Sequence, residues 1–111
     1  MSQFTPAGGG GSELVTATER IVSYSAVNLS VPTAATEVAL VVPSDVIWFR
    51  VKNRTDGTTQ LGFGSGDSSS LYYTIWPGFD PVFTKKSGGT VTLYFQCPKA
   101  GQILELVYGH S

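Results

Sequence analysis

The feature that most constrains this chain is a repeated alternation of apolar and polar residues with a period of two. Successive side chains of a β-strand point to opposite faces of a sheet, whereas an amphipathic helix needs apolar residues at i, i+3, i+4 and i+7. No segment has the helical pattern. The alternation is clearest at Val38, Leu40 and Val42, at Ile47, Phe49 and Val51, at Leu71, Tyr73 and Ile75, and at Val91, Leu93 and Phe95. It predicts an all-β protein.

Turn-forming residues separate these segments at short intervals. They include Pro43-Ser44-Asp45, the Asp56-Gly57 pair and Cys97–Gly101, and Pro77-Gly78 has the order that a type II turn requires. Seven to eight strands fit between the turns. We therefore expect an antiparallel β-sandwich or jelly roll, with a closed barrel as the alternative.

The first expected strand contains a break in the alternation. Val22 and Tyr24 share one parity, whereas the apolar residues from Val27 to Val31 share the other. A shift of one residue moves the apolar side chains to the opposite face of a sheet. We therefore predict a bulge or bend near Ala26.

The N-terminal residues differ in composition from the rest of the chain. Residues 1–18 are rich in Gly, Ser and Thr, contain the run Gly8–Ser12 and show no periodicity. We expect an extended N-terminal arm over residues 1–18, held by a neighbouring subunit, and a β-sandwich domain over residues 19–111.

Charge and hydropathy argue against several classes of partner. The formal net charge is −1, and no basic cluster exceeds the Lys85-Lys86 pair, so we expect no nucleic acid and no membrane surface as partner. No apolar run approaches the eighteen residues of a membrane-spanning helix, and Met1 to Ala17 lacks the pattern of a signal peptide.

The residues that carry common chemistry are few. The single histidine, His110, is the penultimate residue and is expected to be frayed, and the single cysteine, Cys97, precedes a proline. The carboxylates are scattered without metal-ligand spacing, and the glycine-rich Gly62–Gly66 segment leads to a strand, which favours a flexible hairpin loop over a phosphate-binding loop. We expect no catalytic residue, no metal and no cofactor.

Aromatic residues fall into two groups by parity. We expect a core position for Phe49, Phe63, Tyr73 and Phe95. The outward or turn positions belong to Trp48, Tyr72, Trp76 and Tyr94. Outward aromatics either form a contact surface or cover the second sheet. Trp48 beside Arg50 is the strongest candidate for contact, since aromatics and arginine dominate binding hot spots.

Four segments together form one plan, in which strands are separated in order by an Asn turn, a Gly-x-Gly loop, an aliphatic-x-Pro-Gly turn and a glycine turn. They are Val51–Gly64, Tyr73–Gly78, Val91–Gln96 and Ala100–Leu106. This plan resembles that of small structural proteins of tailed bacteriophages, over residues 46–108. The resemblance implies a virion protein made in the host bacterial cytoplasm, and it carries no catalytic residue.

Our functional hypothesis is a capsid decoration or cement protein. Its partner is the major capsid protein or another virion protein, and it acts as a homo-oligomer, with a trimer favoured. The expected interaction residues are Phe4, Thr5, Pro6, Trp48, Arg50, Tyr72 and Trp76. The alternative is a carbohydrate-binding or host-receptor-binding module of a tail or fibre, in which outward aromatics stack on sugar rings.

Overall fold

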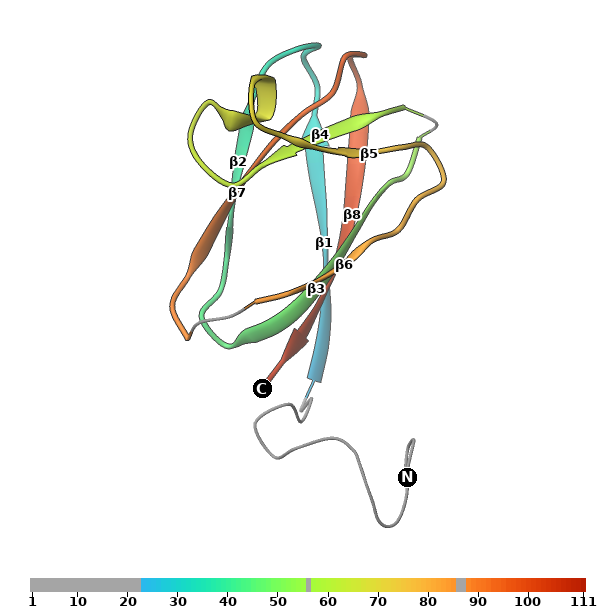
Figure 1. Ribbon diagram of the computed structural model, residues 1–111. Helices are drawn as coiled ribbons and strands as arrows, with labels where there is room; N and C mark the ends of the chain where they lie inside the picture. Colours follow the sequence, from blue (N-terminus) through green and yellow to red (C-terminus); the bar gives the residue numbers. More distant parts are fainter. Residues whose placement is uncertain (1–22, 56, 86–87) are drawn as a thin grey trace.

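The computed structural model describes residues 23–55, 57–85 and 88–111 (Figure 1). The predicted arm over residues 1–18, with Phe4, Thr5 and Pro6, lies outside the described residues. The described part forms eight strands and a short 3₁₀ turn, Asp67–Ser69. The strands are β1 Ser23–Val31, β2 Val38–Val42, β3 Val46–Asn53, β4 Thr59–Gly62, β5 Tyr73–Ile75, β6 Val82–Thr84, β7 Val91–Gln96 and β8 Gln102–His110. The all-β prediction is confirmed.

The strands form two four-stranded antiparallel sheets, in the orders β1-β8-β3-β6 and β2-β7-β4-β5. β1 pairs with β8, β2 with β7, β3 with β6 and β4 with β5. The first half of the chain therefore runs against the second half like one long hairpin, which wraps into two facing layers (Figure 1). This is the double-sheet jelly roll, and the sheets remain separate instead of closing into a barrel.

The core lies between the sheets and follows the predicted alternation. Val42, Phe49, Val51, Leu93 and Phe95 are at most 3% exposed. Complete burial of one such side chain contributes about 1.5–3 kcal/mol. The predicted inward positions are thus correct at these residues. The inward position predicted for Ile47 is wrong, because the register shift in β3 buries Val46 instead.

The predicted bulge near Ala26 is wrong. β1 is continuous and pairs with β8 in unbroken register from Ser23–His110 to Val31–Gln102. Tyr24 lies on the outward face, so the apparent change of parity comes from an outward aromatic residue and not from a bend. The irregularity lies instead in β3, where the register shifts between Val46 and Trp48.

The glycine-rich segment between β4 and β5 is organised by a carboxylate. Glu37 accepts hydrogen bonds from the backbone N–H groups of Gly66, at 3.0 Å, and Ser68, at 3.4 Å, and from the Ser68 hydroxyl. These bonds lower the pKa of Glu37 below its ordinary value, and the bond from the Ser68 hydroxyl has the largest effect. The segment expected to be a flexible hairpin loop contains a 3₁₀ turn instead, and its N–H groups bind an anion from the same chain.

The single cysteine and the single histidine of the sequence differ from each other in setting. Cys97 is fully buried, and burial raises the pKa of its thiol, which keeps it protonated. His110 is the last residue of β8, and its side chain is 17% exposed. The expectation of a frayed His110 is wrong, because the register with β1 and β3 holds it in the sheet.

Candidate functional site

The outer face of the β1-β8-β3-β6 sheet carries the predicted Trp48 and Arg50. In the strand register, Tyr24, Gly109 and Trp48 form one cross-strand row, and Ala26, Val107 and Arg50 form the next. We call this surface the Trp48 face and define it by Tyr24, Trp48, Arg50, Lys52, Asp80 and Glu105. The outward orientation predicted for Trp48 and Arg50 places both on this one surface.

An aromatic pair forms one end of the Trp48 face. The ring centroids of Tyr24 and Trp48 lie 6.0 Å apart with their planes inclined by 58°. Their strands flank β8, so their backbones are separated by two strand spacings, or about 10 Å. Gly109 lies between them in the register and has no side chain, which lets the rings meet across β8. Tyr24 is 66% exposed.

Ion pairs organise the rest of the face. Arg50 Nη2 lies 2.6 Å from Asp80 Oδ2, and Glu105 accepts from both Arg54 Nε, at 2.7 Å, and Lys52 Nζ, at 3.5 Å. The hydrogen bond from Arg54 is the main cause that lowers the pKa of Glu105. Exposed pairs of this kind stabilise the fold little, so their principal effect is to orient the side chains.

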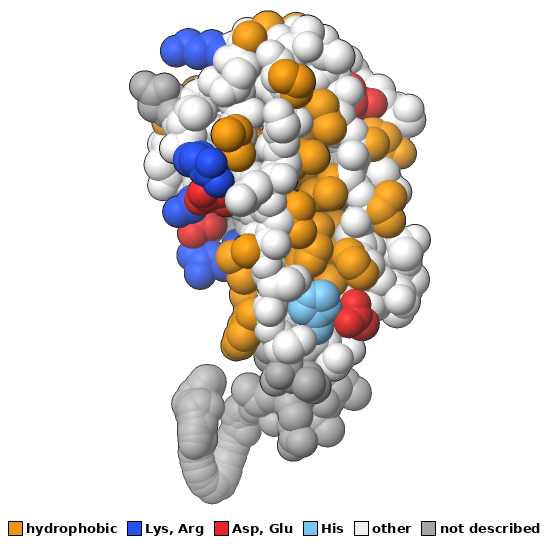
Figure 2. Space-filling model, turned by 180° about the vertical axis from the view of Figure 1, so that it is seen from behind, with side chains coloured by type: hydrophobic (Ala, Val, Ile, Leu, Met, Phe, Trp, Pro, Cys, Tyr) orange, Lys and Arg blue, Asp and Glu red, His pale blue; other side chains and the backbone are white. Residues whose placement is uncertain are grey.

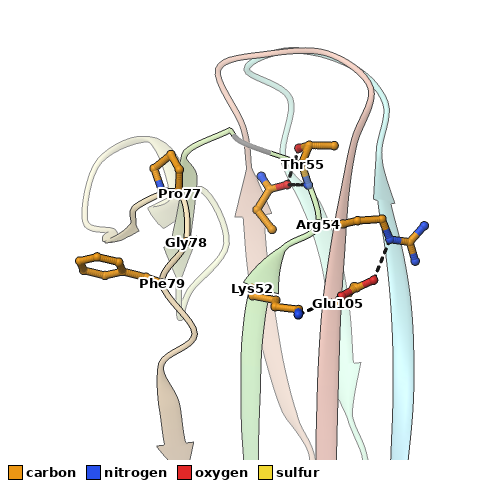
Figure 3. Close-up of a pocket in the computed structure, with 8 residues that line it drawn as sticks. Lys52, Arg54, Thr55, Pro77, Gly78, Phe79 and Glu105 are labelled. Atoms are coloured by element: carbon orange, nitrogen blue, oxygen red, sulfur yellow. Dashed lines mark hydrogen bonds and ion pairs between the residues drawn. The ribbon is translucent and has the colours of Figure 1, made fainter.

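Two adjoining grooves open on this side of the sheet. One, of about 540 Å³, has Tyr24, Trp48, Arg50 and Asp80 in its wall. The second, of about 480 Å³, lies between the end of β3 and the 77–79 turn (Figure 3). Lys52 and Glu105 belong to both, so the Trp48 face is a continuous, charged and partly aromatic concave surface.

The turn beside the second groove has the predicted geometry. Phe79 N–H donates to the Trp76 carbonyl at 3.0 Å, and Gly78 has a φ of 85°. A positive φ at the third position defines the type II turn and favours glycine there. The turn exposes 56% of Trp76 and 55% of Phe79.

The predicted interaction residues Tyr72 and Trp76 lie elsewhere, on either side of β5 in the other sheet. They belong to a second surface, which we call the aromatic edge. Six of the ten exposed large apolar residues in the described part of the chain define it: Phe63, Leu71, Tyr72, Tyr73, Trp76 and Phe79. Val82 is also exposed, but it pairs with Arg50 and therefore lies on the Trp48 face. The structure therefore divides the predicted contact residues between two surfaces.

The core positions predicted for Phe63 and Tyr73 are wrong. They are 54% and 47% exposed, because Phe63 follows the end of β4 and Tyr73 lies in the edge strand β5. Both rings contact Phe83 edge-on, at centroid distances of 6.1 and 5.7 Å, and Phe83 stacks on the buried Phe49 at 5.2 Å. Phe83 thus connects the core to the aromatic edge.

Tyr24, Asp80 and Phe79 were not predicted as contact residues from the sequence. Tyr24 was assigned to the parity of Val22, and neither Asp80 nor Phe79 belongs to a recognisable motif. The cross-strand partners of Trp48 and Arg50 depend on which strands pair, which local alternation does not specify. Tyr94, also expected outward, is half-buried in β7.

Residues 23–55, 57–85 and 88–111 contain no group of three or more His, Cys, Asp or Glu side chains able to hold a metal ion. No helix within those same ranges is long and apolar enough to cross a membrane.

Comparisons with known proteins give little further information. No family model and no curated protein matches the chain. A solved structure, the solution NMR structure of a de novo designed double-stranded β-helix, is similar with a TM-score of 0.49 and 12% identity, over 78% of this chain and 96% of that one. At this level of similarity the designed protein carries no argument about function.

Proposed function

We propose that this chain is a structural protein of a bacteriophage virion, of the capsid decoration type, which attaches to the major capsid protein or another virion protein through its aromatic edge. The observation that carries the proposal is the concentration of six of the ten exposed large apolar residues of the described part between Phe63 and Phe79. Concentrated apolar exposure of this kind marks protein interaction surfaces.

The size of the aromatic edge supports a protein partner. Five of its residues are aromatic and each is about half exposed. Since an aromatic side chain presents about 150–250 Å², their rings together expose on the order of 500 Å². That is a large part of the ~800 Å² that one partner contributes to a standard protein interface.

The chemistry of the edge indicates what kind of surface it meets. Residues 68–79 contain no Asp, Glu, Lys or Arg, so a complementary surface is apolar and uncharged. The interface cores of stable assemblies have this character, with aromatics enriched and charges depleted. The resemblance to tailed-phage structural proteins, and the use of jelly rolls in viral capsid proteins, support the virion as the location.

A binding experiment with particles tests this function. Phage capsids assembled without the chain are mixed with the purified protein, and bound copies are counted after sedimentation. We expect saturable binding that the double variant Trp76→Ser/Phe79→Ser abolishes. The control is Val41→Ser, which removes a side chain that is 57% exposed on β2. Absence of binding by the unmodified protein would refute the proposal.

A second function, carbohydrate binding, is favoured by the Trp48 face. The Tyr24–Trp48 pair borders a groove that also holds the Arg50–Asp80 ion pair. Aromatic faces that stack on sugar rings and charged groups that bond hydroxyls are the two elements such a site needs. Glycan-array binding that is lost in Trp48→Ala and retained in Trp76→Ala would establish this function, and no binding to any glycan would exclude it.

A further inference from the structure

The side of the sandwich opposite the aromatic edge is bordered by β1 and β2. Each sheet has two edge strands, β1 and β6 in one and β2 and β5 in the other. The contact between Phe83 of β6 and Tyr73 of β5 puts these two strands on the same side. The remaining edge strands, β1 and β2, therefore flank the opposite side.

Aliphatic residues line this second side. Val27 and Leu29 of β1 and Val38 and Leu40 of β2 pack against the core and stay partly exposed. We call these four residues the β1–β2 seam. Figure 2 shows a continuous stripe of hydrophobic side chains that ends at the single histidine, His110.

Three polar residues meet at that histidine. Ser25 Oγ lies 2.7 Å from His110 Nε2, and Asp45 Oδ2 lies 3.0 Å from His110 Nδ1. Ser25 has the same parity in β1 as Val27 and Leu29, so it continues the line of the seam. The three residues come from β1, the end of β8 and the turn between β2 and β3.

Neighbouring contacts fix the geometry of the cluster. Ser111 donates to the Asp45 carbonyl through its N–H, at 2.8 Å, and through its hydroxyl, at 3.2 Å. The ring of Tyr108 meets the His110 ring edge-on at 6.1 Å. Both the turn that carries Asp45 and the imidazole are thereby held in place, while Ser25 is exposed.

We propose that Ser25, His110 and Asp45 form a nucleophile, base and orienting acid that hydrolyse esters with an apolar acyl chain, and that the acyl chain lies along the β1–β2 seam. The order of hydrogen bonds is that of a serine hydrolase triad, which is defined by geometry and not by sequence order or fold. This activity is separate from the proposed attachment to a virion, because it uses neither the aromatic edge nor the Trp48 face.

The chemical steps balance within these three residues and water. With its ring proton on Nδ1, His110 donates to Asp45 and accepts the Ser25 proton at Nε2. Ser25 Oγ then bonds to the ester carbonyl carbon, and the alkoxy C–O bond breaks as His110 returns the proton to the leaving alcohol. His110 then takes a proton from water, whose oxygen bonds to the acyl carbon. The acyl–Oγ bond breaks as His110 gives that proton to Ser25 Oγ, which releases the acid and restores the three residues.

Donors for the carbonyl oxygen are supplied by the edge of β1. In an antiparallel ladder, alternate residues of an edge strand direct their N–H groups away from the partner strand. The free side of β1 is the side that borders the seam. Either the Ser25 N–H or those of the residues next to it therefore point away from β8, and in the proposal these groups donate to the ester carbonyl oxygen.

Hydrolysis of p-nitrophenyl acetate and p-nitrophenyl octanoate by the purified full chain tests the proposal. We expect Ser25→Ala and His110→Gln each to lower kcat/KM by about 100-fold or more, since general base catalysis contributes 10²–10⁴-fold. Ser30→Ala, on the opposite face of β1, is the matched control and leaves the rate unchanged. Unchanged hydrolysis in Ser25→Ala would overturn the proposal, as would no hydrolysis above buffer by the unmodified chain.

Two further measurements separate chemistry from folding. A fluorophosphonate probe is expected to label Ser25, as located by mass spectrometry, and labelling confined to other residues would contradict the assignment. Asp45 is a positioning residue, so Asp45→Asn lowers kcat while Asp45→Glu restores part of it. Leu29→Ser lowers kcat/KM for the octanoate more than for the acetate. Equal losses on both esters would contradict binding of the acyl chain along the β1–β2 seam.

Discussion

Each of the two open sides of the sandwich is bordered by a pair of edge strands, but different side chains line the two sides. On one side, β5 and β6 are bridged by aromatic rings around Phe83, and further aromatic residues extend from that cluster into solvent. On the other side, β1 and β2 are lined by partly exposed aliphatic residues and end at a hydrogen-bonded polar cluster. A jelly roll thus provides two unlike surfaces from equivalent pairs of edge strands.

The difference has a physical basis in side-chain shape. Phe83 and its neighbours span the distance between the sheets and close the β5–β6 side, and the surplus aromatic area remains outside as a contact surface. The shorter Val and Leu side chains of the β1–β2 seam pack against the core and stay partly exposed. This difference underlies our proposals of attachment through the first side and of acyl-chain binding along the second.

The largest expected effect is at Phe83, the residue that closes the aromatic side. Phe83→Ala removes a ring that stacks on the buried Phe49 and contacts Phe63 and Tyr73. Since Phe-to-Ala substitutions in cores cost 3–5 kcal/mol and Phe83 is only half-buried, we expect a loss of about 3 kcal/mol. Urea denaturation measures it, and a loss below about 1 kcal/mol would show that the cluster does not close this side.

A smaller loss is expected from the matching change in the β1–β2 seam. Leu29→Ala removes an aliphatic side chain that is packed against the core and partly exposed. A cost of about 2 kcal/mol is expected, at the low end for Leu-to-Ala, because solvent already reaches the site. The same denaturation experiment compares the two sides directly. A larger loss for Leu29→Ala than for Phe83→Ala would reverse the comparison.

The pH dependence of stability tests the loop between β4 and β5, which Glu37 holds from just before β2. The lowered pKa of Glu37 in the folded chain means that its stabilising effect is complete above the ordinary glutamate pKa of 4.5. The effect is lost as the pH falls through the lowered value. Glu37→Gln is therefore expected to be less stable than the unmodified chain near neutral pH, with the difference shrinking in acid. A difference that is constant with pH would contradict this role.

The smallest effect on stability is expected from the exposed aromatics. Trp76→Ser/Phe79→Ser removes two side chains that are more than half exposed, outside the core. Surface changes of this kind usually stay within about 0.5 kcal/mol. Thermal unfolding checks this value. A near-zero change would show that these attachment residues do not contribute to the stability of the fold. The variant would then be suitable for the particle-binding experiment.

The candidate surfaces were predictable only in part. Trp48 and Arg50 were found because outward parity within one strand is a local property. Tyr24 was missed because its partner Trp48 is two strands away across Gly109. The aromatic edge was hidden for a related reason: Phe63 and Tyr73 have core parity, yet they lie where a sheet ends.

The sequence by itself determined the all-β class, most inward residues of the central strands and the type II turn at Pro77-Gly78, because alternation and turn chemistry act over a few residues. Only the tertiary structure decided which strands are edges, where the irregularity of β3 lies and which polar groups meet. His110 is 85 positions from Ser25 and 65 from Asp45. Such contacts depend on which distant strands pair. A period-two pattern is compatible with many pairing arrangements, and packing of the core selects one of them.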